Sequence, residues 1–352
     1  MNARRWIKFY ILIFALSTLS AFFINYKIDD FAVFRSDYHH LHQEPNQNFI
    51  KMKFLLTKKH HYDSFIFGSS RVGKIMPYNI PNGHYYNMTY SEGLPLEHLS
   101  NIKLLIQKGI PIKNVMIGLD DFSYEVDPAK HLQQLLRKPH YETDLGKETP
   151  LEFYFDYLLI RPSFSDLSRV VNEKFFHKKY AGYDYDIFGS GVPVIPTEVE
   201  ERIEKNPLKH MHDSKFLKPD SYRGNRIEET IETLKAIVQL SKTYHFNLII
   251  FINPIHKTTY LDTDFENFQT FKKRLAGITD YYDFSGLNSV TENNYFYFET
   301  SHYRPIVGEF IKSRIFGDAN CTCPDDFGVL VTHENIDRHL EDLEKQLKSS
   351  KQ

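Results

Sequence analysis

Cysteine is nearly absent from this chain of 352 residues: the only two, Cys321 and Cys323, are separated by a single threonine. A disulfide across one intervening residue is strained and uncommon. Two thiolates alone do not complete a zinc site, and no third cysteine exists. We therefore interpret the pair as free thiols or a labile bridge, and we expect the chain to fold without disulfides.

An excess of charge is also missing. The 43 Lys and Arg residues nearly balance the 45 Asp and Glu residues, for a formal net charge of −2, so no global field attracts nucleic acid. The sequence has no Walker-type loop and no Gly-x-Gly-x-x-Gly run. The His39-His40-Leu41-His42 cluster has no evident carboxylate or cysteine partner, so we expect it to be solvated rather than metal-binding. These absences predict no nucleic-acid partner, no metal and no cofactor.

One long apolar run is present near the amino terminus, from Phe9 to about Ile24, after three basic residues within 1–8. It reads as an uncleaved signal anchor or as a cleaved signal peptide, with a buried helix as a third possibility. Its end, Phe22-Phe23-Ile24, is bulky rather than Ala-x-Ala-like, which favours an anchor over residues 9–25. The basic residues then place 1–8 in the cytoplasm and everything after about residue 28 outside.

Strand-like and helix-like runs alternate from about residue 61, after a polar, His-rich stretch (26–60) that we interpret as a spacer. Alternation of this kind predicts an α/β domain over 61–330 with a mainly parallel sheet covered on both faces, in a three-layer α/β/α arrangement. A Pro- and aromatic-rich stretch, about 121–225, breaks the rhythm and predicts a helical insertion after the third strand. A charged amphipathic helix is expected within 331–352. The expected strands are Ser64–Phe67, Tyr85–Met88, Asn114–Leu119, Asn247–Ile252 and Tyr281–Phe284.

Two short segments carry candidate chemistry. Ser70 follows an apolar strand and the tight turn Gly68-Ser69, and Glu299 precedes His302 by three residues. A serine hydroxyl is a poor nucleophile until a base takes its proton, and the base needs a carboxylate to hold its tautomer. Each segment alone is a weak signal, because Gly-Ser-Ser turns are common and the chain has 17 histidines.

The order of the segments resembles that of the SGNH (GDSL-like) hydrolase superfamily, and especially its membrane-anchored DltD-like and alginate O-acetylation-like branch. Four blocks carry the resemblance over about residues 61–316: Gly68-Ser69-Ser70, the segment ending in Gly93, Gly118-Leu119-Asp120-Asp121, and Glu299-Thr300-Ser301-His302. The resemblance implies an SGNH, flavodoxin-like fold and a catalytic Ser70, His302 and Glu299. It also implies an oxyanion hole from Ser70, Gly93 and the position of Asp120.

Two of these positions depart from the family's pattern. Glu299 replaces an aspartate, which is mild because either carboxylate orients an imidazole. Asp120 replaces an asparagine that would donate to the oxyanion, whereas an ionised carboxylate only accepts. Asp120 is therefore protonated, turned elsewhere or neutralised by Arg71 or Arg304, or the hole uses backbone amides alone.

The resemblance implies a serine-dependent O-acyltransferase or esterase that acts on cell-envelope glycan or polymer esters through an acyl-Ser70 intermediate. It implies a place in the bacterial cytoplasmic (inner) membrane, as a single-pass protein with the main domain extracytoplasmic. Expected partners are the membrane, an acylated donor, a glycan or polymer acceptor, and a multi-pass acyl-export membrane protein. The alternative is a catalytically inactive envelope protein that binds glycan or acts as a scaffold.

Overall fold

A single six-stranded sheet organises the chain in the computed structural model, which describes residues 3–161, 164–178, 182–317 and 322–350. The strand order is β2-β1-β3-β4-β5-β6; the first five strands run parallel, and β6 is antiparallel to β5. This confirms the prediction of an α/β fold with a mainly parallel sheet. The strands are β1 Ser64–Phe67, β2 Tyr85–Asn87, β3 Asn114–Leu119, β4 Asn247–Ile252, β5 Tyr281–Asp283 and β6 Val329–Val331.

The central strands are buried on both faces, as expected for a parallel sheet. Alternate side chains of a strand point to opposite faces. Accordingly, Phe65 and Phe67 of β1 belong to one apolar cluster, and Ile66 between them belongs to the other. Met116 of β3 and Phe251 of β4 join Ile66 in the second cluster. Continuous apolar runs in the sequence therefore build two cores, one on each side of the sheet.

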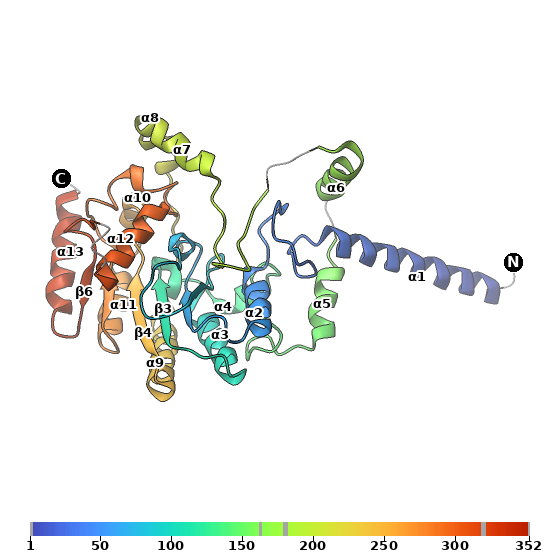
Figure 1. Cartoon of the computed structure of the whole chain (residues 1–352), viewed down its shortest axis with the longest axis horizontal. Coiled ribbons are helices and arrows are strands. Elements are labelled where there is room, and N and C mark those ends of the chain that lie inside the picture. Colours follow the sequence, from blue (N-terminus) through green and yellow to red (C-terminus); the bar gives the residue numbers. More distant parts are fainter. Residues whose placement is uncertain (1–2, 162–163, 179–181, 318–321, 351–352) are drawn as a thin grey trace.

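Helices cover both cores (Figure 1). The first core receives side chains from α2 Gln47–Thr57, α3 Pro95–Gln107, α9 Ile227–Tyr244 and α11 Phe265–Ala276. The second receives them from α12 Pro305–Phe316 and the short 3-10 helix η1 Val72–Lys74. Proline at the first turn opens α3 and α12, and Gly317 in the left-handed region ends α12, as capping rules require.

The segment expected as a spacer is part of the folded domain, which corrects that expectation. Residues 47–57 form α2, in which Phe49, Ile50 and Met52 are buried. Val33, upstream, is fully buried as well. The apolar residues of this stretch are interleaved with Lys, Asn and His, which masks their helical spacing in the sequence. Only part of the His cluster is solvated: His39 and His40 are exposed, but Leu41 is buried.

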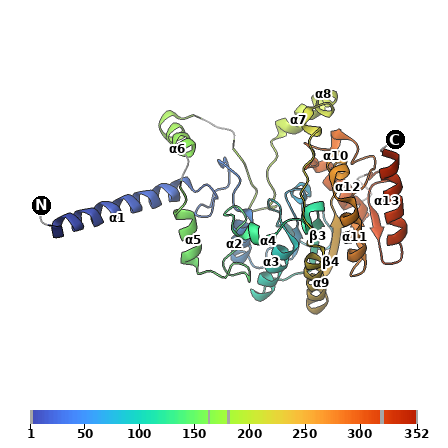
Figure 2. The same cartoon turned by 180° about the vertical axis from the view of Figure 1, so that it is seen from behind.

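The region between β3 and α9 is a series of short helices with no strand of the sheet among its described residues. Part of it lies beside the amino-terminal helix and part lies at the opposite end of the domain, near α10, Lys257–Asp262, and α12 (Figures 1 and 2). Its elements are η2 Asp121–Tyr124, α4 Pro128–Leu132, α5 Pro150–Leu158, α6 Phe164–Phe176, α7 Thr197–Lys205, α8 Pro207–Met211 and η3 Ser214–Phe216.

The amino-terminal helix α1, Ala3–Ile28, extends away from the rest of the molecule (Figure 1). Its most apolar window has a mean hydropathy of 2.0 and is 0% buried, so it is not a core helix. Its 26 residues span about 39 Å at 1.5 Å per residue. The helix is long and apolar enough to cross a membrane or to serve as a signal anchor.

The carboxyl-terminal part adds an edge strand that the sequence did not predict. β6 has only three residues, two of them exposed, so it carries no strand-like pattern. β6 leads to α13, Ile336–Ser350. One further short helix, η4, spans Asn294–Phe296. Cys323 is a free, half-buried thiol, and Cys321 lies outside the described residues.

Candidate active site

The candidate residues gather at the carboxyl edge of the sheet. Ser70 follows β1, Gly93 lies in the loop after β2, and Asp120 follows β3 directly. Parallel strands end at a common edge, which is where ligand crevices form in open α/β sheets. His302 reaches this edge from the loop between η4 and α12.

Ser70, His302 and Glu299 form a continuous hydrogen-bonded chain. Ser70 Oγ lies 2.8 Å from His302 Nε2, across 232 positions of sequence. His302 Nδ1 lies 2.5 Å from Glu299 Oε1. An ionised carboxylate only accepts, so Nδ1 carries the proton and Nε2 is left to accept the Ser70 hydroxyl proton. The arrangement is therefore that of a nucleophile, a base and a carboxylate that orients the base.

Glu299 is fixed as an acceptor by the loop that carries it. Its Oε1 also accepts from the His302 backbone N–H at 3.0 Å, and its Oε2 accepts from the Ser301 N–H at 2.6 Å. Burial alone would raise the pKa of Glu299, but these bonds and the partner imidazole together hold it below its ordinary value. Side-chain exposures of 33% for His302 and 36% for Glu299 leave the pair accessible from solvent.

Glycine is required in the turn that carries Ser70 and in the loop that packs on this turn. Gly68 has φ +151°, and a Cβ there would lie 2.4 Å from Val72 Cγ2. A Cβ on Gly93 would lie 2.7 Å from the carbonyl oxygen of Gly68, so the loop after β2 packs directly on the turn that holds Ser70. The structure thus brings Gly93 to the nucleophile segment, as the resemblance implies.

The amides of the expected oxyanion hole differ in their availability. Among the described residues, the Ser70 N–H has no acceptor within the protein. The Gly93 N–H donates to the Tyr90 carbonyl at 3.3 Å, a long bond within its own turn. The Ser70 N–H is therefore free to donate to an oxyanion. The Gly93 N–H could do so only after its weak bond to the Tyr90 carbonyl breaks.

No hydrogen bond joins the Asp120 side chain to Ser70 or His302 in the described part of the chain. Its Oδ1 accepts from Arg71 at 3.0 Å and from Asn253 at 3.0 Å, and its side chain is 0% exposed. Arg71 also donates to Asp121 at 2.7 Å. Burial raises the pKa of Asp120 above its ordinary value, against the lowering effect of Arg71. Of the two arginines considered, Arg71 provides the countercharge, whereas Arg304 pairs with Glu200.

Arg71 has a second role that the sequence did not reveal. Its Nε donates to the Ser301 carbonyl at 3.0 Å, and its guanidinium lies 5.2 Å from the centre of the Phe122 ring. Arg71 thus holds the loop that carries His302 as well as the two aspartates after β3. A charged residue with 1% side-chain exposure cannot be recognised as buried from its sequence neighbours.

Glu92, directly before Gly93, was also overlooked. It has φ +53°, and its carboxylate takes contacts from three residues of the region between β3 and α9. These are Tyr222 at 2.7 Å, Arg137 at 3.0 Å and His131 at 3.1 Å. A left-handed conformation costs free energy for a residue other than glycine, so these contacts fix the backbone that precedes the Gly93 amide.

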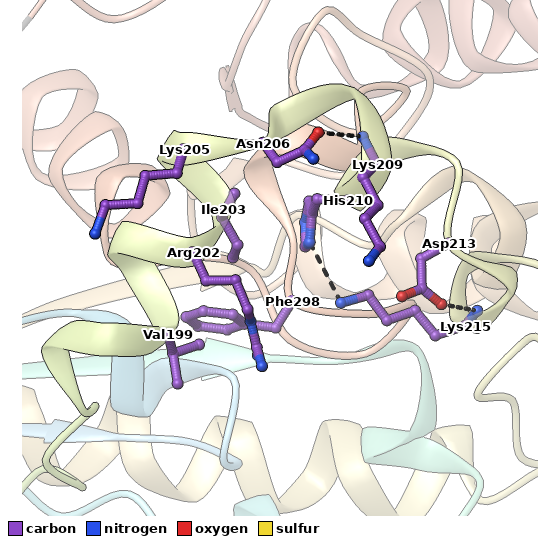
Figure 3. A pocket seen from close by; sticks show the side chains of 10 residues that line it. All are labelled: Val199, Arg202, Ile203, Lys205, Asn206, Lys209, His210, Asp213, Lys215 and Phe298. Carbon is purple, nitrogen blue, oxygen red and sulfur yellow. Dashed lines mark hydrogen bonds between the residues drawn. The ribbon is translucent and has the colours of Figure 1, made fainter.

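A basic pocket of about 760 Å³ borders the His302 loop (Figure 3). Phe298, next to Glu299, lines it from below, and α7, α8 and η3 supply the other walls. Its cations include Arg202, Lys209 and Lys215, none of which forms an ion pair with a carboxylate in the described part of the chain. Burial lowers the pKa of Lys215, with a further lowering from Arg202, against the raising effects of Asp213 and Glu299.

No protein-family model matches the chain, and no curated protein matches it. Within the residues that the structure describes, no group of three or more His, Cys, Asp and Glu side chains could hold a metal ion.

Proposed function

We propose that the chain is a serine-dependent O-acyltransferase or esterase of SGNH type, which acts on esters of cell-envelope glycan or polymer. The observation that carries the proposal is the hydrogen-bonded chain Ser70–His302–Glu299. The three-layer SGNH arrangement belongs to the same proposal, supported by the two apolar cores on either side of the parallel sheet.

In the proposed mechanism, Ser70 Oγ attacks the carbonyl carbon of the acyl donor while its proton passes to His302 Nε2. The developing oxyanion is stabilised by the Ser70 and Gly93 amides. The bond to the donor alcohol breaks, and the alcohol leaves with the proton from His302, giving acyl-Ser70. Water or a sugar hydroxyl then attacks this ester, its proton goes to His302, and Ser70 is released with that proton.

The position of Asp120 is compatible with this mechanism. A free carboxylate in the oxyanion hole would repel the negative charge, but Asp120 is engaged by Arg71 and Asn253. The hole then depends on backbone amides alone.

The basic pocket supports a more specific acceptor, a polymer that bears carboxylates or phosphates. Cations without carboxylate partners attract such groups, and the pocket is next to the loop of the base. The single-pass bacterial inner-membrane location, with the domain extracytoplasmic, belongs to the proposal too and is supported by α1 and the basic residues before it. An acyl-export membrane protein would be the donor's source.

The test uses the full chain in detergent, with 4-nitrophenyl acetate and a fluorophosphonate probe. Ser70→Ala and His302→Ala should each lower kcat/KM by about 10³-fold or more, and the probe should label Ser70. Matched controls are Ser301→Ala, whose hydroxyl makes no hydrogen bond among the described residues, and exposed His61→Ala. Equal rates for all four variants would refute the proposal. Absence of labelling in a folded protein would favour the glycan-binding or scaffolding alternative.

A further inference from the structure

Two short helices next to α1 expose apolar stripes to solvent. The stripe on α5 recurs every four residues, and the stripe on α6 recurs after seven and then four residues, so each lies along one helix face. Their exposed fractions are Leu151 69%, Phe155 38% and Leu159 64% on and after α5, and Phe164 87%, Val171 46% and Phe175 75% on α6. So many large exposed apolar side chains in one region mark an interaction site.

The position of these stripes along α1 indicates what they contact. Asn25, where the apolar run of α1 ends, donates to the carbonyls of Leu158 at 2.7 Å and Ile160 at 2.6 Å. Phe22 packs edge-on against Phe155, with 5.5 Å between the ring centres. The end of α5 therefore lies level with the end of the apolar run. Figures 1 and 2 show α5 and α6 on opposite sides of this end of α1.

The joint between α1 and the domain is held by several contacts. Asp29 accepts from the backbone N–H groups of Val33, at 2.9 Å, and Arg35, at 2.9 Å. Tyr26 of α1 contacts Phe34, which in turn contacts Tyr154 of α5. These contacts fix α5 relative to α1. If α1 crosses a bilayer, the apolar stripe of α5 therefore lies at the surface of that bilayer.

We propose that α5 and α6 form a seat that lies on the lipid bilayer, with their apolar stripes inserted at the level of the headgroups. Amphipathic helices bind this zone through an apolar face and flanking basic residues. Three exposed cations lie on or next to these helices in the chain: Lys27 in the last turn of α1, Arg161 between α5 and α6, and Lys178 after α6. Their charge fits a surface that contains anionic lipid. The seat rests on the proposed membrane location of α1, but it does not depend on the chemistry of Ser70.

The experiment places a tryptophan in the seat and measures its quenching by brominated lipid. The full chain with its only tryptophan removed, Trp6→Phe, is reconstituted into vesicles of phosphatidylcholine with one third phosphatidylglycerol. The reporter is Val171→Trp on α6, and the matched control is Leu330→Trp on β6, since both side chains are 46% exposed. Chains brominated near the headgroup should quench the reporter at least about fivefold more than the control.

Equal, negligible quenching of both tryptophans would overturn the proposal and would assign this face to a membrane protein instead of lipid. If Val171→Trp fails to fold, as judged by circular dichroism, Phe164→Trp replaces it at a side chain that is 87% exposed. A second change, Phe175→Glu in the reporter protein, should abolish the quenching, because it puts a charge in the inserted stripe. Retained quenching in that variant would also contradict the seat.

Discussion

The buried group formed by Arg71, Asp120 and Asp121 permits a quantitative prediction. All three side chains are at most 1% exposed, and one guanidinium serves two carboxylates. The group therefore carries an excess of negative charge when both aspartates are ionised. Removal of the cation and removal of one anion should have opposite effects on stability.

Arg71→Leu should lower the free energy of unfolding by about 3–5 kcal/mol, the usual cost of leaving a buried charge without its partner. Asp121 would lose the partner it has at 2.7 Å, whereas Asp120 would keep its bond to Asn253. Domains have about 5–15 kcal/mol of stability in total, so this loss is severe. Asp120→Asn should instead be neutral or stabilising, because Arg71 and Asp121 remain as a balanced pair.

The pH dependence of Asp120→Asn has a definite sign. The pKa of Asp120 is raised in the folded protein from 3.8, so the folded state binds its proton more tightly than the unfolded state. Ionisation of Asp120 therefore costs stability as the pH rises above about 4. Asp120→Asn lacks this cost. Its gain in the free energy of unfolding over the unmodified chain should therefore be absent near pH 3.5 and should grow toward neutral pH.

Thermal unfolding of the full chain in detergent, followed by circular dichroism, measures both effects. The midpoint should fall by on the order of 5–10 °C for Arg71→Leu. Lys242→Leu, at an exposed position on α9, is the control for loss of a cation and should leave the midpoint almost unchanged. A midpoint for Arg71→Leu that matches this control, or a strong destabilisation by Asp120→Asn at pH 7, would refute the reasoning.

Two further predictions concern the reaction. Glu299→Gln should lower kcat for acetyl esters by about 10³–10⁴-fold with little change in KM, since an amide no longer enforces the tautomer of His302; an unchanged kcat would exclude an orienting role. Combined replacement of Arg202, Lys209 and Lys215 by alanine should raise KM for a polyuronate or polyphosphate acceptor about tenfold or more in transfer assays at low salt. The kinetics with small neutral esters should be unaffected. Equal losses with both kinds of substrate would argue against an anion-binding pocket.

Much of the sheet could be predicted because its longer strands are mainly apolar runs of four to six residues between turn residues. β1, β3 and β4 have the predicted bounds. β6 and α2 were not predicted, for opposite reasons: β6 is short and exposed, whereas α2 mixes buried apolar side chains with Lys51, which is itself buried. Composition does not distinguish a buried lysine from a solvated one.

The catalytic candidates were found from the order of their segments, but their environment was not. Ser70, His302 and Glu299 belong to recognisable short patterns. Arg71 and Glu92 form hydrogen bonds and ion pairs with residues more than 30 positions away, and no local sequence pattern predicts such contacts. Long-range polar pairing inside a fold is set by tertiary geometry, which a single sequence does not display.

The stiff joint between α1 and the domain limits where the protein can work. A flexible tether would let an enzyme sample a wide shell of space above its anchor. Here the hydrogen bonds of Asn25 and Asp29 tie the end of α1 directly to the domain. Every copy would therefore hold Ser70 at the same height above a bilayer that α1 crosses. Under the proposed function, only polymer segments that reach this height could be modified, so distance from the lipid surface would select the position of the substrate.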